Sequence, residues 1–368
     1  MLRTIAVENY RSLRYLVTEL DGLNVVTGAN GSGKTSFYRA LRLLADLVRE
    51  GAISTLSKEG GMRSALHAGP RRDGRVAMRL GFASDDLSYA IDLGLPQLGP
   101  FVLDPEVKTE AIWAGPVLRP STLLADRHGT HVRTRGDDGA WRDADWKLGV
   151  HESLMSALAD PSQTPELFAI REQAKRWRFY DHFRTDPEAG ARRPGIATYT
   201  PVLSPDGGDL AAALLTIERI GSATALQAAV ALAFDGSTLA LTEDETDGAC
   251  RVALSQPGIR RPLSAPELSD GTLRFLLLAA ALLSPRPPGL LVLNEPESSL
   301  HPSLMPALAA LIADAAERSQ VVVVTHADQL VRALRPDARL IELVKSDGVT
   351  TIADQLACEG PTWTWPKR

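Results

Sequence analysis

The chain has 368 residues, of which 44% are hydrophobic and 23% are charged, as in a soluble globular protein with a sizeable core. Its length allows two domains, or one domain with a large insertion, and its longest apolar run, Phe275 to Leu283, is too short to span a membrane. A net charge of −5 gives no basic field for nucleic acid, two cysteines are too few for a disulfide framework, and the N-terminus lacks a signal peptide, so we expect a cytoplasmic protein without a membrane partner.

The N-terminal region predicts strands followed by a helix. Thr4 to Asn9 and Arg14 to Glu19 alternate apolar and polar side chains, as half-buried strands do. Leu23 to Thr27 is a further short strand, and after Lys34 apolar side chains recur at helical spacing. A glycine-rich loop therefore joins a strand to a helix.

That loop, Gly28-Ala29-Asn30-Gly31-Ser32-Gly33-Lys34-Thr35, matches the phosphate-binding P-loop in the required context. Glycines let backbone N–H groups turn toward phosphate oxygens, and the helix adds the positive end of its dipole. Lys34 brings a charge to the β- and γ-phosphates of ATP, and the Thr35 hydroxyl is a ligand for Mg²⁺. The residues predicted to bind the nucleotide here are Asn30, Gly31, Ser32, Gly33, Lys34, Thr35 and Ser36.

The middle of the chain carries weaker patterns. Residues 75–95 alternate as strands, whereas residues 97–150 are rich in Gly, Pro, Asp and Arg and show only short apolar pieces. Helical stretches are expected from about Leu154 to Phe183, with a break near Asp160-Pro161, and from about Leu210 to Phe234. The absence of sustained heptads excludes a long coiled-coil arm.

Two small groups of residues in this region have patterns that occur in binding sites. His128 and His131 have a spacing that could bind a metal on a helix, but glycine-rich surroundings favour a loop. Trp177 and Tyr180 lie among basic residues and could stack a nucleic-acid base, but aromatic side chains in a small core are the more ordinary interpretation.

The C-terminal region alternates helices with fully apolar strands. We expect helices over 271–283, 304–315 and 328–334, buried strands over 290–293 and 320–325, a hairpin over 339–352, and a poorly ordered end over 361–368. This alternation predicts an α/β fold with a largely parallel sheet.

Polar residues follow the two buried strands. Glu295 is the candidate for polarising the attacking water, and Asn294 stands where an Asp would assist the metal. An amide accepts a hydrogen bond from metal-bound water but brings no charge, so we expect weaker Mg²⁺ binding. His326 follows the second strand, where ligands bind in α/β sheets, and is a candidate contact of the γ-phosphate.

The segment Leu268-Ser269-Asp270-Gly271-Thr272 resembles the signature motif of ABC-type ATPases. Together with the P-loop, the LLVLNEPESSLHP segment and Thr325-His326, it resembles the ABC-like ATPases of the RecF/SMC/OLD group, and in particular their compact AAA-type members. The opening Glu8-Asn9-Tyr10-Arg11-Ser12-Leu13 is similar to the start of these proteins. The resemblance covers residues 1–95 and 262–345, not the middle.

This resemblance implies a P-loop NTPase of α/β class with an ABC-type ATPase head, in which a mixed sheet is flanked by helices. The head would be assembled from residues 1–95 and 255–352, with an insertion carrying a helical lobe over 96–254 and a tail over 353–368.

It also implies roles for several residues. Ser269 and Gly271 would touch the γ-phosphate of an ATP held by a second copy of the chain, which makes an ATP-dependent homodimer the expected assembly. His326 would be the switch histidine, and Arg11 would approach the phosphates or the base. The glutamine that links Mg²⁺ to the helical lobe has no clear counterpart, and Gln97 is a candidate by position only.

Three functions compete. The first is an ATPase that acts as a switch on DNA, in repair or in defence against phage. The second is a regulatory ATPase that controls a separately encoded effector, such as a nuclease or toxin; the residues after His326 are too few for the Toprim domain of OLD-type nucleases. The third and least favoured is a transport ATPase.

Overall fold

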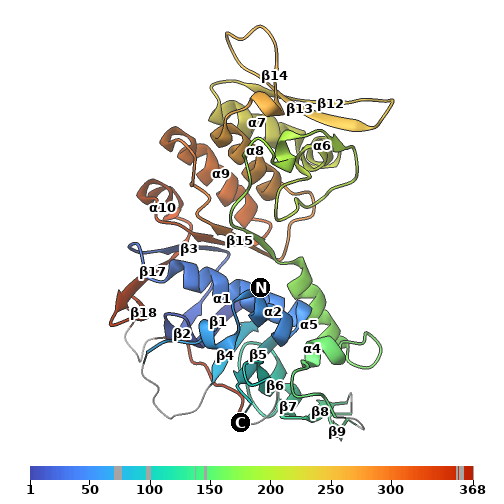
Figure 1. Cartoon of the computed structure of the whole chain (residues 1–368), viewed down its shortest axis with the longest axis vertical. Helices are drawn as coiled ribbons and strands as arrows, with labels where there is room; N and C mark the ends of the chain where they lie inside the picture. The colour runs from blue at the N-terminus through green and yellow to red at the C-terminus, as the bar shows by residue number, and fades with distance from the viewer. Residues whose placement is uncertain are drawn as a thin grey trace. The chain divides into compact units, whose positions relative to one another are not determined.

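The computed structural model describes residues 1–69, 77–96, 101–136, 138–144, 147–353, 355 and 360–367 (Figure 1). The chain forms two compact units: a first unit of Met1–Asp21, Val26–Trp177 and Ile341–Arg368, and a second unit of Gly22–Val25 and Arg178–Leu340. The predicted domains, a head formed from both ends of the chain with an insertion between them, differ from these two units and remain a prediction.

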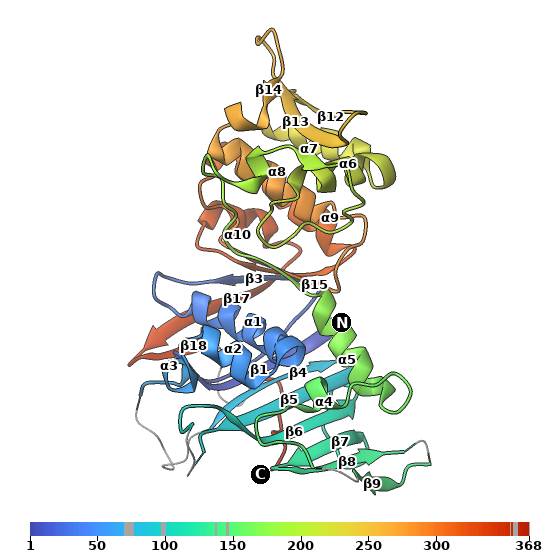
Figure 2. The same cartoon turned by 45° about the vertical axis from the view of Figure 1, so that its right-hand side comes forward.

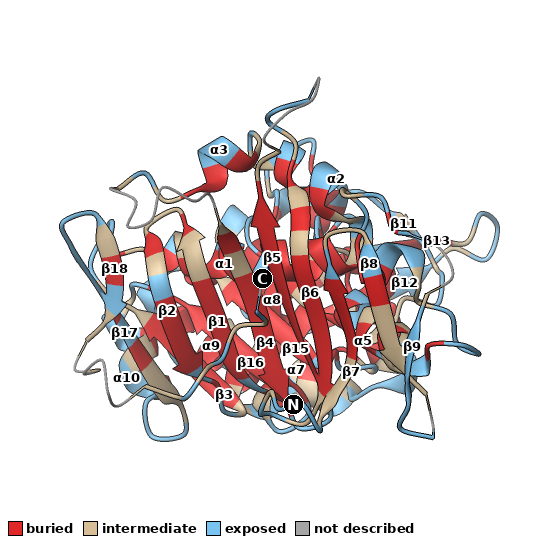
Figure 3. Cartoon of the chain, turned by 90° about the horizontal axis from the view of Figure 1, so that it is seen from below, coloured by how far each residue is buried: buried red, intermediate tan, exposed pale blue. Residues whose placement is uncertain are grey.

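An antiparallel sheet is the centre of the first unit. Figure 3 shows the buried residues that run along its middle strands. In spatial order its strands are β2 (Leu13–Glu19), β1 (Leu2–Tyr10), β4 (Met78–Ser84), β5 (Leu87–Gly94), β6 (Glu106–Ala114), β7 (Leu123–His128), β8 (His131–Arg135) and β9 (Trp141–Asp143).

Residues 106–143 contribute four of these strands, where the sequence had indicated only short apolar pieces. Strand β6 is buried on both faces over most of its length, so its side chains do not alternate between apolar and polar. Glu110 is fully buried there and accepts hydrogen bonds from Tyr89 (2.7 Å) and Ser153 (2.6 Å). A buried charge and the intervening turn residues hide the strand pattern.

Helices cover one face of this sheet (Figure 2). Helix α1 (Lys34–Glu50) packs against α2 (Ala52–Lys58), α4 (Leu154–Ala157) and α5 (Pro165–Arg176), and α3 (Met62–Ala65) is a single turn. Arg49, in the last turn of α1, donates to the carbonyl oxygens of Ala174 at 2.9 Å and Trp177 at 2.7 Å. This contact ties the P-loop helix to α5.

The end of the chain lies over the other face (Figure 3). The rings of Trp363 and Trp113 are 5.7 Å apart between centroids, and Trp365 follows at 5.3 Å from Trp363. A Cβ at Gly81 would lie 2.6 Å from the Trp363 ring, so this glycine makes room for it. The expectation of a poorly ordered end is therefore wrong for these two tryptophans.

The second unit is built on a parallel sheet. Strands β10 (Arg178–Tyr180), β15 (Leu290–Asn294) and β16 (Gln320–Val324) pair in that order, and the first residues of β3 (Leu23–Thr27) follow β16. Every residue of β16 is buried, as expected for a strand covered on both faces.

Helices and a small sheet complete the second unit's core. They are α6 (Leu210–Ile220), α7 (Ala223–Ala233), α8 (Asp270–Leu282), α9 (Met305–Ala316) and α10 (Asp328–Leu334), with β11 (Gly195–Ile196), β12 (Thr238–Glu243), β13 (Ala249–Ser255) and β14 (Leu263–Ser264). No helix in the described part of the chain is long and apolar enough to cross a membrane.

Two predicted helices need correction. In the stretch from Leu154 to Phe183, the break expected near Asp160-Pro161 is confirmed, but the second helix ends at Arg176, before Phe183, and strand β10 follows it. The stretch from Leu210 to Phe234 is two helices separated at Gly221, where a Cβ would lie 2.9 Å from the Ile217 carbonyl oxygen. Ser222 then caps the second helix by accepting from the Ala225 N–H.

The predicted C-terminal hairpin is confirmed. Strands β17 (Arg339–Ser346) and β18 (Val349–Ile352) pair antiparallel, with Leu343 opposite Ile352 and Ser346 opposite Val349. Residues of β17 from Ile341 onward and all of β18 belong to the first unit.

Candidate functional site

The P-loop of the first unit has the predicted strand, loop and helix arrangement. Gly28, Gly31 and Gly33 have φ angles of 145°, 77° and 109°. Residues other than glycine rarely adopt these backbone conformations. Gly33 is the residue before helix α1, whose N-terminus has no side-chain cap and no acidic residue in its first turn. The positive end of this 17-residue helix is therefore uncompensated by the chain itself.

Two polar side chains of the loop suit the binding of an anion. The Lys34 Nζ donates to the carbonyl oxygens of Gly28 (2.6 Å) and Ala29 (3.1 Å), so the ammonium group is curled over the loop. The Ser32 hydroxyl is buried and has no hydrogen-bond partner among the described residues. An orphaned hydroxyl beside an ammonium group and a bare helix terminus fits a bound phosphate. Asn30, Gly31 and Thr35 are exposed around it.

Arg11 has a partner of its own. It lies in the turn between β1 and β2 with a positive φ of 49°. Its guanidinium group pairs with the Glu59 carboxylate and donates to the Tyr10 hydroxyl at 3.1 Å. Burial opposes ionisation of Glu59, but hydrogen bonds from Arg11 and Tyr10 outweigh it and lower the pKa of this carboxyl. Arg11 would have to leave Glu59 to contact a nucleotide.

The carboxyl ends of the parallel strands in the second unit gather the other predicted groups. Asn294 ends β15, and Glu295 follows with a positive φ of 45° while its N–H donates to the Val324 carbonyl oxygen at 2.7 Å. The buried Arg274 of α8 donates to the Glu295 carbonyl oxygen at 3.1 Å. These contacts on both sides of the peptide hold Glu295 in a conformation that is rare for a residue with a side chain.

His326 faces two carboxylates. Its Nδ1 lies 3.5 Å from Glu295 Oε1 and 3.4 Å from Glu297 Oε1. Glu297 is 9% exposed and accepts from the Thr325 hydroxyl at 2.5 Å and from the His326 N–H at 3.1 Å. Glu297 thus fixes the strand end that presents the histidine, a role that no sequence pattern predicts.

A carboxylate stands beside the unusual amide of this edge. Because β10 pairs with β15 in parallel with Tyr180 opposite Leu293, Asp181 and Asn294 emerge at the same edge. The Asn294 side-chain amide donates to Asp181 Oδ1 at 2.7 Å. The negative charge that position 294 lacks is therefore present on the neighbouring strand.

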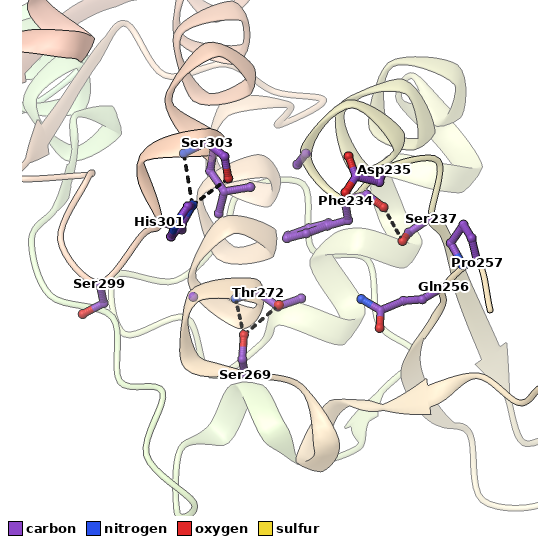
Figure 4. A pocket seen from close by; sticks show the side chains of 13 residues that line it. Phe234, Asp235, Ser237, Gln256, Pro257, Ser269, Thr272, Ser299, His301 and Ser303 are labelled. Carbon is purple, nitrogen blue, oxygen red and sulfur yellow. Dashed lines mark hydrogen bonds between the residues drawn. The ribbon is translucent and has the colours of Figure 1, made fainter. Parts of the chain in front are cut away.

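The predicted signature residues begin helix α8. Ser269 is the N-cap and accepts from the Thr272 N–H at 3.1 Å. Gly271 lies so close to the next loop that a Cβ would be 3.1 Å from the Ser299 carbonyl oxygen. Both residues line a polar pocket of about 560 Å³ (Figure 4). The pocket's other labelled residues are Phe234, Asp235, Ser237, Gln256, Pro257, Thr272, Ser299, His301 and Ser303.

Arg192 anchors the signature segment, residues 268–272, through several hydrogen bonds. Its side chain is buried and donates to the carbonyl oxygens of Ala265 (3.2 Å), Pro266 (3.2 Å) and Leu268 (2.7 Å). It also donates to Asp270 Oδ1 at 2.7 Å. The sequence showed Arg192 only as half of a basic pair, which is typical of a solvated surface.

The other candidate residues from the sequence do not form a binding site in the described part of the chain. His128 and His131 face each other in the β7–β8 hairpin, and His131 Nε2 is 3.2 Å from Asp143 Oδ1. In the described residues no group of three or more His, Cys, Asp or Glu side chains could hold a metal. Trp177 and Tyr180 are 1% and 2% exposed, so neither ring is available to stack on a base. Gln97 lies outside the described residues.

Comparison with known proteins decides the family. A family model described as "AAA domain, putative AbiEii toxin, Type IV TA system" matches residues 23–332, most of the chain. The chain belongs to this AAA family. No curated protein matches it.

Solved structures show the same fold. The chain is similar to an Smc head bound to the C-winged helix domain of ScpA, with 14% identity and a TM-score of 0.57 over 96% of this chain and 97% of that one. The SMC head domain from Thermotoga maritima is 15% identical, with a TM-score of 0.51 over 96% of this chain and 98% of that one. A third similar structure is the Smc head with an extended coiled coil, bound to the C-terminal domain of ScpA, from Pyrococcus furiosus. It is 13% identical, with a TM-score of 0.54 over 96% of this chain and 95% of that one.

These matches confirm the predicted fold class. The protein has the fold of SMC head domains, and the family match makes it an AAA protein.

Proposed function

We propose that this AAA protein binds ATP with Mg²⁺, hydrolyses it slowly, and dimerises head to head around the nucleotide. The observation that carries the proposal is the P-loop, in which Gly33 directly precedes helix α1 and no side chain caps the N-terminus of that helix. Lys34 and the orphaned Ser32 hydroxyl lie in that loop. Backbone N–H groups from Asn30 to Ser36 would contact the phosphates.

Mg²⁺ supplies positive charge against the phosphate oxygens when it is bound with the nucleotide. The Thr35 hydroxyl is exposed and is the proposed direct ligand. Asn294 would accept a hydrogen bond from metal-bound water, and its bond to Asp181 holds the side-chain amide in one orientation. A hydroxyl oxygen such as that of Thr35 is a ligand that suits a hard cation.

Glu295 is the proposed group that orients the attacking water and accepts its proton. The bonds from Arg274 and to Val324 fix its backbone, so the carboxylate is presented from a rigid strand end. His326 would contact the γ-phosphate, with its ring placed by Glu297. Slow turnover is expected because the negative charge is on Asp181, one strand away, and not at position 294 itself.

Dimerisation follows from the signature segment. Ser269 and Gly271 lie at the N-terminus of α8 and line the polar pocket, a suitable place for the γ-phosphate of a partner's ATP. Arg192 keeps this segment rigid. The ATP held by one copy would therefore be enclosed by the signature segment of the other.

The ATP cycle would act as a switch in DNA repair or in anti-phage defence. The name of the matching family, which refers to a toxin and a type IV toxin–antitoxin system, favours the alternative of a regulatory ATPase that controls a separate effector. A transport role has no such support. If DNA neither binds nor changes ATP turnover at low salt, the DNA role fails; if no protein co-purifies from the host in ATP, the effector role fails.

The catalytic part of the proposal is tested with Glu295→Gln. We expect this variant to bind ATP like the parent and to lose hydrolysis, whereas Lys34→Ala should lose binding. Glu245→Gln, which removes an exposed carboxylate from the turn after β12, is the matched control and should keep full turnover. Undiminished hydrolysis by Glu295→Gln would refute the assigned role.

A further inference from the structure

The C-terminal hairpin of the first unit reaches the P-loop through Thr350. This residue lies on β18 and is fully buried, with a relative exposure of 0%. It belongs to none of the nucleotide-binding motifs.

The Thr350 hydroxyl is bonded to two other segments of the first unit. It donates to the Ser32 carbonyl oxygen at 2.8 Å and lies 2.8 Å from Ser12 Oγ. The Thr350 N–H donates to the Ser12 carbonyl oxygen at 2.9 Å. Ser12 Oγ is in turn 3.1 Å from Ser36 Oγ in the first turn of α1. A chain of hydroxyl groups therefore links the hairpin to both ends of the phosphate-binding turn.

The same side chain fills the space beside Gly33. A Cβ at Gly33 would lie 2.1 Å from Thr350 Oγ1 and 2.7 Å from its methyl carbon. Strand β17 approaches the loop in the same way, because a Cβ at Gly28 would lie 2.2 Å from the Leu343 carbonyl oxygen. Two P-loop glycines are thus required by contact with the hairpin as well as by their backbone angles.

The hydrogen bond to Ser32 has a consequence for the next peptide group. In a planar trans peptide the carbonyl oxygen and the following N–H point in opposite directions. When Thr350 holds the Ser32 carbonyl oxygen, the Gly33 N–H points away from the hairpin. Gly33 is the residue before helix α1, where N–H groups bind phosphate oxygens.

We propose that Thr350 is a positioning residue that fixes the P-loop backbone in its phosphate-binding conformation. The inference rests on the proposed ATP binding. Its hydroxyl orients the peptide between Ser32 and Gly33.

The test compares three variants of the full chain by the affinity for a fluorescent ATP analogue with Mg²⁺. Thr350→Val keeps the shape but removes the hydroxyl and should weaken binding about tenfold, which equals about 1.4 kcal/mol. Thr350→Ser keeps the hydroxyl and should stay within about twofold of the parent. Thr351→Val, on the exposed side of the same strand, is the matched control and should bind normally.

Turnover separates positioning from general damage. The KM of Thr350→Val should rise while kcat at saturating ATP stays near the parent value. Equal affinity of parent and Thr350→Val overturns the inference, whereas failure of the parent to bind ATP overturns the proposed function instead. If Thr350→Val does not fold, Ser12→Ala is measured in its place: weakened ATP binding supports the hydroxyl chain, and unchanged binding overturns it.

Discussion

Glu297 makes the most quantitative prediction about the histidine-bearing edge. Its carboxylate is 9% exposed and receives two hydrogen bonds, from the Thr325 hydroxyl at 2.5 Å and from the His326 N–H at 3.1 Å. A hydrogen bond to a charged group contributes about 1.5–3 kcal/mol to stability. Thr325→Val removes one of them without changing the size of the side chain, together with the bond that the Thr325 hydroxyl accepts from the Ala327 N–H at 3.0 Å.

We therefore expect Thr325→Val to lower the free energy of unfolding of the second unit by about 2 kcal/mol. Thr325→Ser retains the hydroxyl and should lose less than about 1 kcal/mol, mainly through its missing methyl group. Urea unfolding followed by circular dichroism measures both variants. ATP turnover should fall more in Thr325→Val, because the backbone that presents His326 loses its anchor.

A comparison with Glu297→Gln tests the importance of charge. The amide oxygen of Gln still accepts one hydrogen bond, but the amide is neutral. The free energy of unfolding of Glu297→Gln should therefore lie between those of the parent and Glu297→Ala. If Thr325→Val proves as stable and as active as Thr325→Ser, the carboxylate does not hold this strand end and the reasoning is wrong.

Two further predictions concern charge. Asn294→Asp should lower the Mg²⁺ concentration needed for ATP binding, Asp181→Asn should raise it, and the double exchange should restore it; unchanged Mg²⁺ dependence in Asp181→Asn would contradict this. The pKa of Glu59 is lowered from 4.5, so its pairing with Arg11 stabilises the protein above that pH and less as pH falls through the lowered value. The unfolding free energies of parent and Glu59→Gln should differ at pH 7 and converge as pH falls through the lowered pKa; a constant difference would count against the pairing.

The sequence predicts the parts of the site that are local in the chain. The segment Gly28–Thr35 carries its own glycines, lysine and flanking elements, and the apolar runs that end at Asn294 and Thr325 are too regular to be missed. Each of these signals depends on a few consecutive residues. For the same reason strands β15 and β16 were predicted with nearly correct bounds, whereas β10 fell within a predicted helix.

The contacts that position these groups could not be predicted, because they join distant residues. Asp181 meets Asn294 only after β10 pairs with β15, and Thr350 reaches Ser32 only after the hairpin closes. Arg192 is indistinguishable in the sequence from a surface arginine. Strand β6 was missed for another reason, since its burial on both faces removes the alternation that marks a strand.

The most direct test of the ATP-dependent dimer is the mass of Glu295→Gln in solution. Light scattering after size-exclusion chromatography should give the monomer mass of 39.6 kDa without nucleotide and twice that mass with ATP and Mg²⁺. Ser269→Arg combined with Glu295→Gln places a bulky side chain at the α8 N-terminus and should remain monomeric. A monomeric Glu295→Gln that has ATP bound would contradict the proposed nucleotide-enclosing dimer.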